Sequence, residues 1–426
     1  MKRLLALILT TGLLMACQGS AQREKLPEPP PVPDNPNVRI AAYIRATWGL
    51  PDGTQPPAGQ RPAGWTSTPG WTAAQIKGEY LTDLMLSFAL ISDNDKSQIT
   101  FAPINDGHYL WGEIAKLKVM YPNMRINLSV GGWGADHFSD MASNTALRRG
   151  FVANVMQYLK EKNLDGIDID WEYPVGPPWG QEIKSRREDK GNWVILLKEL
   201  RAGLNALGKE TGKRYYLSSC VPSVQWFTER NDCAGAAQWV DSLKLMAYSH
   251  YGGWSSTTGH NANLYRNPAD PQSWSTDQAV QAYLKAGVSP KKIMLGFPTY
   301  GIEWKGVEGG PIKNLPGLFS GKFTRGVRSD APGLDIGYYP TIKNYLQPGS
   351  GFTRYWDNAS KAPFLYNPNA NGGTWVSYTD KEALQELAKY AKEKNLGGLF
   401  YWEYAWDMEA DLLQSAHESV AKEFNL

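Results

Sequence analysis

The sequence predicts an α/β protein folded as a (β/α)8 TIM barrel, with a small α+β subdomain inserted between strands 7 and 8. Short apolar runs alternate with amphipathic segments from Val38 onward, the apolar runs number eight, and one interval between them is too long for a single helical crossover. An open, doubly wound sheet is the alternative, but no GxGxxG phosphate loop follows the first apolar run. The barrel is therefore the favoured fold.

Each expected strand is a short apolar run bounded by Gly, Pro or polar residues. In order, the runs are VRIAAYI (38–44), LTDLMLSFAL (81–90), MRINLSVGG (124–132), GIDIDWEYP (166–174), RYYLSSCVP (214–222), SLKLMAYS (242–249), KIMLGFP (292–298) and GGLFYWEY (397–404). Several intervals between them carry apolar residues at the 3.6-residue period of an amphipathic helix. These segments are 145–163, 192–210, 275–288 and 380–395.

The interval between KIMLGFP and GGLFYWEY is about 100 residues long, whereas one βα unit of a barrel needs about 30 to 40. Residues 303–373 within it are rich in Gly, Pro and aromatic residues, and they are too many for a loop without structure of its own. We therefore expect an insertion subdomain over 303–373, on the rim of a catalytic barrel that spans 38–426.

The N-terminus predicts an exported lipoprotein. MKRLLALILTTGLLMACQGS combines two basic residues with an apolar run too short to span a bilayer. The LMAC sequence that ends at Cys17 resembles the lipobox of bacterial lipoproteins, which implies a signal peptide over 1–17 and lipid on the Cys17 sulfur; a plain secretory signal is the alternative. The Pro-rich segment 18–37 is expected to be a semi-rigid linker. Gln18 resembles the sorting pattern for the outer membrane, so the expected location is periplasmic or at the cell surface, on a lipid anchor.

Composition narrows the choice of function. Lys and Arg total 44 and Asp and Glu total 42, without a dense basic run, so there is no electrostatic case for nucleic acid. The 17 Trp and 22 Tyr exceed what a core alone requires, and flat rings with a polar edge suit partly wet, sugar-binding surfaces. Cys220 and Cys233 either form one disulfide or are buried thiols. No cofactor is expected.

The segment DGIDIDWEYP (165–174) places carboxyl groups in a strand that is otherwise apolar. Side chains alternate along a strand, so Asp168, Asp170 and Glu172 share one face while Trp171 and the two isoleucines share the other. The acids then point into the barrel and converge at its C-terminal mouth, where barrel enzymes keep their chemistry. Close carboxyls cannot all ionise, so the row shares protons. Glu172, nearest the mouth, is the natural proton donor.

Two other readings of the acidic strand remain. The acids could lie on the solvated edge of an amphipathic strand, although the other strands show no such polar alternation. Three carboxylates could also hold a divalent metal ion, but no histidine or second acidic cluster obviously completes such a site. A metal-dependent hydrolase would respond to chelators.

DGIDIDWEYP resembles the DxxDxDxE signature of glycoside hydrolase family 18, the chitinase family, and further segments support this resemblance. LSVGGW (128–133) resembles the SxGG strand end, LMAYSHYGGW (245–254) the MxYD strand, LGFPTYG (295–301) the seventh strand, GGLFYWEY the last strand, and FLYNPNANGGTWVSYTD (364–380) the exit from the chitinase insertion domain. The resemblance covers 38 to about 411.

The resemblance implies substrate-assisted, retaining hydrolysis of β-1,4-linked N-acetylglucosamine, one of the exceptions to the two-carboxylate scheme of glycosidases. Glu172 would protonate the leaving oxygen and then activate water. Asp170 would orient the acetamido group, which itself attacks the anomeric carbon. Asp168 would lie deeper and share a proton with Asp170. Tyr248 matches the tyrosine that holds the acetamido carbonyl oxygen.

Aromatic positions of the family also have counterparts. Trp402 matches the ring that floors the subsite next to the scissile bond, and Met246 would line the same pocket. The other expected substrate-binding residues are Tyr43, Phe88, Trp133, Tyr173 and Trp254. For each of these rings, packing in the core is the competing explanation.

Two positions depart from the family pattern: Ser249 stands where an aspartate is usual, and Ile302 where an arginine is common. Neither change removes the proton donor, whereas lectin-like relatives typically lose it. The expected function is therefore a monomeric chitinase acting on chitin or chitooligosaccharides. The alternatives are an endo-N-acetylglucosaminidase acting on peptidoglycan or N-glycans, and a non-catalytic, lectin-like chitin-binding protein.

Overall fold

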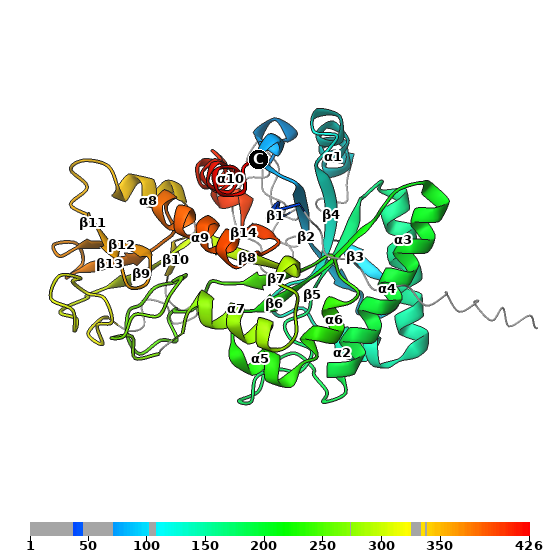
Figure 1. The fold of residues 1–426 in the computed structure, drawn as a ribbon, viewed down its shortest axis with the longest axis horizontal. Helices are drawn as coiled ribbons and strands as arrows, with labels where there is room; N and C mark the ends of the chain where they lie inside the picture. Colours follow the sequence, from blue (N-terminus) through cyan, green and yellow to red (C-terminus); the bar gives the residue numbers. More distant parts are fainter. Residues whose placement is uncertain (1–36, 46–70, 102–107, 273, 325–333, 337–338) are drawn as a thin grey trace, which may run out of the picture.

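The computed structural model describes residues 37–45, 71–101, 108–272, 274–324, 334–336 and 339–426 (Figure 1). Within these residues, eight parallel strands form a closed barrel, because β1 pairs with both β2 and β14. They are β1 (Arg39–Arg45), β2 (Asp83–Ile91), β4 (Arg125–Gly131), β5 (Gly166–Asp170), β6 (Tyr216–Pro222), β7 (Ser242–Met246), β8 (Ile293–Pro298) and β14 (Gly398–Trp402). A short strand, β3 (Ile99–Phe101), adds to β2 in antiparallel fashion. The predicted barrel is confirmed.

Helices surround the barrel (Figure 1). They are α1 (His108–Met120), α2 (Phe138–Ser143), α3 (Thr145–Glu161), α4 (Asp189–Thr211), α5 (Gln225–Arg230), α6 (Cys233–Ala237), α7 (Thr276–Lys285), α9 (Lys381–Glu393) and α10 (Asp411–Phe424), with 3-10 turns at η2 (Ala73–Gln75), η3 (Gly78–Tyr80), η4 (Pro290–Lys292) and η5 (Tyr404–Trp406). Asn144, Ser275 and Asp380 start α3, α7 and α9 by accepting hydrogen bonds from first-turn N–H groups. In the described part of the chain, no helix has the length and apolar character needed to cross a membrane.

A second, antiparallel sheet lies between β8 and β14 in the chain and forms the left side of the molecule in Figure 1. Its strands run in the order β10-β9-β13-β12-β11, and α8 (Tyr339–Tyr345) accompanies them. The strands are β9 (Gly301–Lys305), β10 (Leu334–Ile336), β11 (Thr353–Asp357), β12 (Ala362–Asn367) and β13 (Thr374–Ser377). This sheet has its own buried cluster, which includes Trp304, Phe364 and Trp375.

The predicted signal peptide with Cys17, and the linker up to residue 36, lie outside the described residues.

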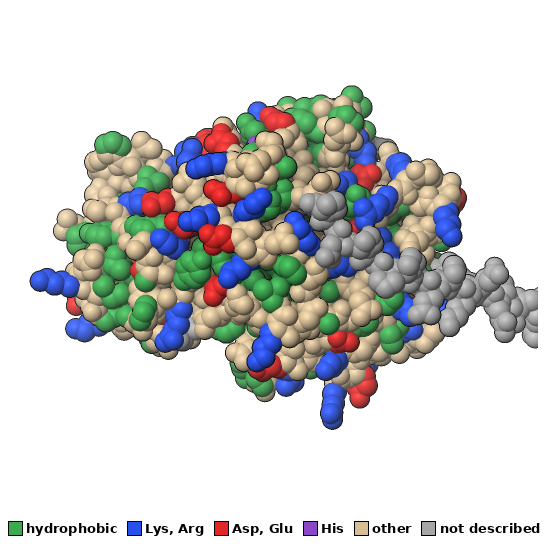
Figure 2. Space-filling model, in the orientation of Figure 1, with side chains coloured by type: hydrophobic (Ala, Val, Ile, Leu, Met, Phe, Trp, Pro, Cys, Tyr) green, Lys and Arg blue, Asp and Glu red, His purple; other side chains and the backbone are tan. Residues whose placement is uncertain are grey.

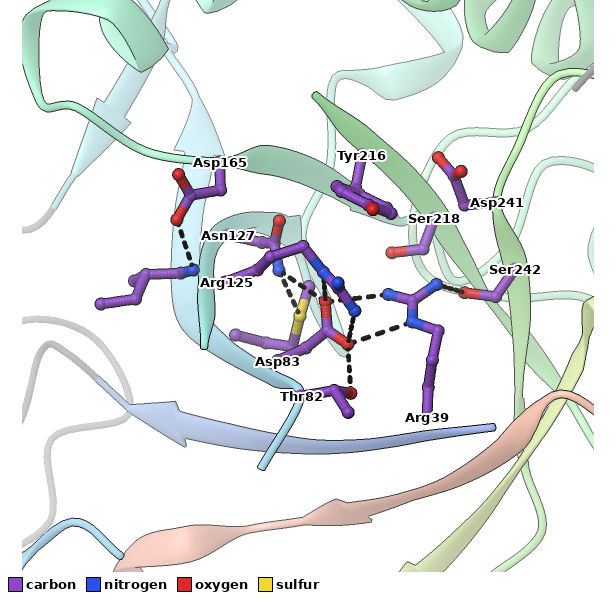
Figure 3. A network of polar contacts seen from close by, with 12 residues as sticks. Arg39, Thr82, Asp83, Arg125, Asn127, Asp165, Tyr216, Ser218, Asp241 and Ser242 are labelled. Carbon is purple, nitrogen blue, oxygen red and sulfur yellow. Dashed lines mark hydrogen bonds and ion pairs between the residues drawn. The ribbon is translucent and has the colours of Figure 1, made fainter. Parts of the chain in front are cut away.

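The N-terminal end of the barrel is closed by ion pairs (Figure 3). Asp83 on β2 is fully buried and accepts hydrogen bonds from Arg39 (3.0 and 2.9 Å) and from Arg125 (both 2.8 Å). Thr82 (2.7 Å) and Asn127 (3.3 Å) donate to the same carboxylate. Burial raises the pKa of Asp83, but the two arginines outweigh it and hold this pKa far below its ordinary value. This end of the barrel is therefore a fixed, fully ionised structural network.

The described residues on the face shown in Figure 2 have no comparable concentration of one charge. In Figure 2, basic and acidic side chains are interspersed over the face shown. This distribution agrees with the near balance of 44 basic and 42 acidic residues.

Candidate active site

The acids of β5 project into the barrel, as the alternation of side chains predicted. Asp168 pairs in register with Ser129 of β4 and with Ser218 of β6, and hydroxyls of both neighbours reach it. On the opposite face, Trp171 is buried in the main core and stacks on Phe138 of α2, with ring centroids 5.3 Å apart. The solvated-edge reading of this strand is wrong, because Asp168 is 0% exposed.

Asp168 is saturated with hydrogen-bond donors. Its Oδ2 accepts from Tyr43 Oη (2.8 Å) and Ser129 Oγ (2.8 Å), and its Oδ1 accepts from Ser218 Oγ (2.6 Å) and Lys244 Nζ (3.1 Å). Burial raises the pKa of Asp168, but the charge of Lys244 and the hydroxyl donors outweigh it and leave the pKa below its ordinary value. Asp168 is thus a stable carboxylate.

Asp170, two residues further along the same face, is in the opposite situation. It is 4% exposed, and its Oδ1 has no hydrogen-bond partner. Burial, followed by the charges of Glu172 and Asp168, raises its pKa well above the ordinary value. No direct hydrogen bond joins the side chains of Asp170 and Asp168, because donors already occupy both oxygens of Asp168. Cys220 lies between the two acids: it hydrogen-bonds Asp170, and its Sγ lies 3.7 Å from Asp168 Oδ2. A proton shared by the two aspartates stays a prediction.

Glu172 follows the end of β5 and is half-buried. Burial raises its pKa to about 7, against a smaller lowering by a hydrogen bond from Tyr173. A carboxyl group with a pKa near neutrality can both give and take a proton, which is what a general acid and base requires.

The glycines of LSVGGW allow β4 to approach the acids closely. Gly131 and Gly132 have φ of +121° and +96°, and a Cβ on Gly131 would collide with the carbonyl oxygen of Asp170. The N–H of Gly132 donates to that same carbonyl at 2.9 Å. This pair of glycines therefore fixes the strand end that carries Asp170.

Most of the predicted pocket residues meet beside the acids in one cluster. The predicted residues in this cluster come from the ends of four strands: Tyr43, Phe88, Met246, Tyr248 and Trp402. The rings of Phe88 and Trp402 stack at 5.3 Å, and Tyr43 lies 5.9 Å from Trp402. The charges of Asp170 and Glu172 contribute to raising the pKa of Tyr248, after burial and its nearer neighbours Cys220 and Tyr300, so its hydroxyl stays protonated.

Two predicted outer residues are exposed rings at the mouth. Trp133 is 81% exposed and lies edge-on to Tyr173, with centroids 6.4 Å apart. Trp254 is 63% exposed, and its ring packs over Gly252, where any side chain would collide with it. Among the described ring contacts, Trp254 is not joined to the cluster around Trp402.

Sequence reasoning missed two further aromatic residues at the mouth. Trp179 is 77% exposed and lies edge-on to Trp226, which in turn contacts Tyr173. The centroid distances are 6.1 and 5.4 Å. We call Trp133, Tyr173, Trp226 and Trp179 the aromatic row. Trp179 could have been noticed, because it stands in the polar, Gly- and Pro-rich stretch VGPPWGQ, where no core would require it.

The two departures from the family pattern have structural explanations. Ser249 has φ of +57°, and its hydroxyl lies 2.6 Å from the hydroxyl of Tyr300. Its neighbour His250 hydrogen-bonds Asn263, and burial lowers its pKa to about 4, so it is neutral near pH 7. Ile302 is 2% exposed in the core of the second sheet.

The two cysteines are both free, so the disulfide alternative is wrong. Cys220 points into the barrel, with its Sγ 2.9 Å from Tyr43 Oη, whereas Cys233 begins α6 and lies in the outer core. The wall of the barrel separates them. Among the described residues, no group of three or more His, Cys, Asp or Glu is arranged to hold a metal ion.

Comparison with known proteins identifies one matching family and several relatives named as chitinases. The family model "Glycosyl hydrolases family 18" matches residues 63–407. Chitinase A1 of Niallia circulans is 31% identical over 393 residues, covering 87% of this chain and 53% of that protein. Endochitinase 1 of Metarhizium robertsii is 28% identical over 407 residues, covering 88% of this chain and 89% of that protein. The chain spans about half the length of the first curated relatives that it matches.

The solved structures that resemble this chain include a chitinase and a further enzyme of family 18. Chitinase ChiW from a Paenibacillus species has a TM-score of 0.75 at 30% identity, covering 90% of this chain and 43% of that one. A family 18 N-acetylglucosaminidase from Paenibacillus barengoltzii has a TM-score of 0.71 at 28% identity, covering 90% of this chain and 100% of that one.

Proposed function

The chain belongs to glycosyl hydrolase family 18, and on that premise we propose that it is a chitinase hydrolysing β-1,4-linked N-acetylglucosamine chains by a substrate-assisted, retaining mechanism. The observation that supports this most strongly is the graded acid row. Asp168 is ionised, Asp170 favours its protonated form, and Glu172 at the mouth has a pKa of about 7. A single proton donor is sufficient when the substrate supplies its own nucleophile.

In the first step, Glu172 gives its proton to the glycosidic oxygen while the acetamido oxygen of the sugar attacks the anomeric carbon. The glycosidic bond breaks, the leaving sugar departs with the proton, and an oxazolinium ion remains. Asp170 and the hydroxyl of Tyr248 hold the acetamido group in place for this attack. In the second step, the Glu172 carboxylate takes a proton from water, and the oxygen of that water adds to the anomeric carbon. The bond between the anomeric carbon and the acetamido oxygen breaks in the same step, which opens the oxazolinium ring and restores the acetamido group. Two inversions give net retention.

The aromatic residues supply the surfaces for sugar rings. Trp402, stacked on Phe88, forms the floor next to the scissile bond, and Met246 lines the same pocket. Trp133 and Trp254 serve further sugars at the mouth, where their exposed rings offer apolar faces with polar edges. A site of this shape suits oligomers or polymers of amino sugars.

We also propose that the protein is a monomeric lipoprotein. Cleavage before Cys17 would leave a lipid on that sulfur, and the Pro-rich segment 18–37 would hold the enzyme up to ~50 Å from the outer membrane. We propose in addition that the second sheet is the chitinase insertion domain. Cys17→Ala is expected to move the protein from the membrane fraction to the soluble fraction, and retention in the membrane fraction would contradict the anchor.

A second candidate is an endo-N-acetylglucosaminidase acting on peptidoglycan or N-glycans. The 28% identical relative named as a family 18 N-acetylglucosaminidase supports this candidate. The missing carboxylate at Ser249 is instead the one feature that favours a lectin-like protein. Both candidates require an acetamido group, whereas a lectin-like protein would not retain a Glu172 poised near neutrality.

The deciding experiment compares substrates of equal length. Chitooligosaccharides should be cleaved, with the β-anomer as the first product seen by NMR, and cello-oligosaccharides should not, because they lack the acetamido nucleophile. Cleavage of both sugars, or the α-anomer at early times, would contradict the mechanism. Cleavage of peptidoglycan or N-glycans alone would select the second candidate.

A further inference from the structure

Strand β7 brings a lysine into the interior of the barrel. Lys244 is 0% exposed, and its Nζ donates to Asp168 Oδ1 at 3.1 Å and to Ser218 Oγ at 2.8 Å. The same ammonium group lies 5.1 Å from the ring centroid of Tyr43. A buried charge is costly unless it is paired and hydrogen-bonded, and here both members of the ion pair are fully buried. The pair is therefore held together strongly.

The ion pair between Lys244 and Asp168 sets Asp168 apart from the other two acids, Asp170 and Glu172. Donors from four strands occupy both oxygens of Asp168, so this carboxylate has no free position for a proton. Asp170 has an oxygen without any partner and is not hydrogen-bonded to Asp168. The side chain of Asp170 reaches the interior through Cys220, which hydrogen-bonds Asp170 and whose Sγ lies 3.7 Å from Asp168 Oδ2. Because the donors already satisfy Asp168, a proton that arrives there is not favoured over one on Asp170.

We propose that Lys244 is a positioning residue that keeps Asp168 ionised, so that the mobile proton of the row stays on Asp170 and Glu172. The inference deepens the proposed function, since it assigns Lys244 a part in setting the protonation of the same site. Lys244 does not touch the substrate and acts through Asp168.

The groups that face Asp168 leave no other source of positive charge in the described part of the chain. Strand β1 contributes Tyr43, β6 contributes Cys220 and β7 contributes Lys244, while Tyr248 lies just beyond the end of β7. Burial raises the pKa of all three neutral groups, so they stay uncharged. The remaining strands β2, β8 and β14 contribute apolar side chains to this cluster: Met85, Met294 and Phe400.

The sign of the effect follows from the charges. The positive charge of Lys244 lowers the pKa of both Asp168 and Asp170. A neutral residue at 244 would make the row bind protons more tightly, so its titration would move to higher pH. An opposite charge at this distance typically shifts a carboxyl pKa by about 1 to 3 units.

Carboxyl 13C NMR titration of the full chain tests the proposal directly, with Asp168→Asn, Asp170→Asn and Glu172→Gln used for assignment. In the wild type, Asp168 should show no titration above about pH 4. In Lys244→Met, its midpoint should rise by about one unit or more. Lys244→Arg, which retains the charge, should preserve the wild-type titration. A wild-type Asp168 that titrates above about pH 4, or an unchanged midpoint in Lys244→Met, would overturn the inference.

The pH profile of kcat/KM on chitooligosaccharides supplies the functional readout. Lys244→Met should move the profile toward higher pH, whereas Ser218→Ala, which removes a neutral contact of the same pair, should move it much less. An equal loss at every pH in Lys244→Met would mean a merely structural role and would overturn the inference. If the wild type hydrolyses no chitooligosaccharide, the proposed function fails, and the NMR titration still decides about Lys244. If Lys244→Met does not fold, a wild-type Asp168 that titrates above about pH 4 would still overturn the inference.

Discussion

The two ends of the barrel hold buried aspartates in opposite electrostatic states. Asp83 at the N-terminal end is fully buried and bound by Arg39 and Arg125, and its pKa lies far below the ordinary value (Figure 3). Asp170 at the mouth is buried almost as completely, yet one of its oxygens has no partner and its pKa is strongly raised. The two aspartates are buried to nearly the same extent, so their hydrogen-bond and ion-pair partners decide whether each one is ionised.

This contrast separates stability from chemistry along the barrel axis. Residues at the N-terminal face of such barrels usually serve stability, and those at the C-terminal face serve function. Asp168 lies between the two ends and resembles Asp83, because a buried cation and several hydroxyls satisfy it. The transition from a fully partnered to an under-partnered carboxyl occurs between Asp168 and Asp170.

The largest expected effect is at the mouth. Glu172→Gln should lower kcat by ~10²- to 10⁴-fold, because a general acid contributes about that much, while oligosaccharide binding persists. Steady-state kinetics and calorimetric binding check this. Glu182→Gln, the same change at an exposed position on the following loop, is the matched control and should be as active as the wild type. Activity of Glu172→Gln within tenfold of the wild type would show that the proton comes from elsewhere.

Asp83→Asn tests the electrostatic difference at the N-terminal end of the barrel. This change leaves Arg39 buried without its carboxylate, so the free energy of unfolding should fall by ~3–5 kcal/mol. The matched substitution Asp170→Asn should cost less than ~1 kcal/mol, because a mostly neutral carboxyl with an unpartnered oxygen loses little, yet it should abolish hydrolysis. Urea unfolding measures both variants. Equal destabilisation by the two changes would remove the distinction between the ends.

The two ends should also respond oppositely to pH. The folded pKa of Asp83 is lowered, so its contribution to stability is present above its unfolded pKa and is lost as pH falls. The folded pKa of Glu172 is raised from 4.5 to about 7, so its contribution is present below about pH 4.5 and is lost as pH rises through 7. Glu172→Gln should therefore gain stability relative to the wild type between pH 4.5 and 7, by ~1–3 kcal/mol. Urea unfolding across this range measures the gain, and a constant difference would contradict it.

The smallest expected effect lies at the outer edge of the mouth. Trp179→Ala should raise KM for long chitooligosaccharides by about 2- to 10-fold, since one aromatic contact is worth ~0.5–1.5 kcal/mol. A short chromogenic substrate that does not reach Trp179 serves as the control and should be cleaved as by the wild type. An equal change for both substrates would mean that Trp179 acts on the fold and not on the sugar chain.

Much of the fold could be predicted from the sequence. Each of the eight apolar runs overlaps one barrel strand, and the four periodic segments correspond to α3, α4, α7 and α9. The period of two along β5 correctly predicted which residues face inward. These features depend on residues a few positions apart, which is the range that periodicity samples. The pairing order of the second sheet and the edge-on contact of Trp179 with Trp226 had no such local signal.

The sequence by itself determined that Asp168 and Asp170 share the inner face of one barrel strand, with Glu172 just beyond its end. Only the tertiary structure decided the charge that each of them carries. The donors to Asp168 are 39, 50, 76 and 125 residues away in the chain, on four other strands. The same closure of the barrel separated Cys220 from Cys233. Strand periodicity is a local property, whereas protonation depends on whatever the fold brings within a few ångströms.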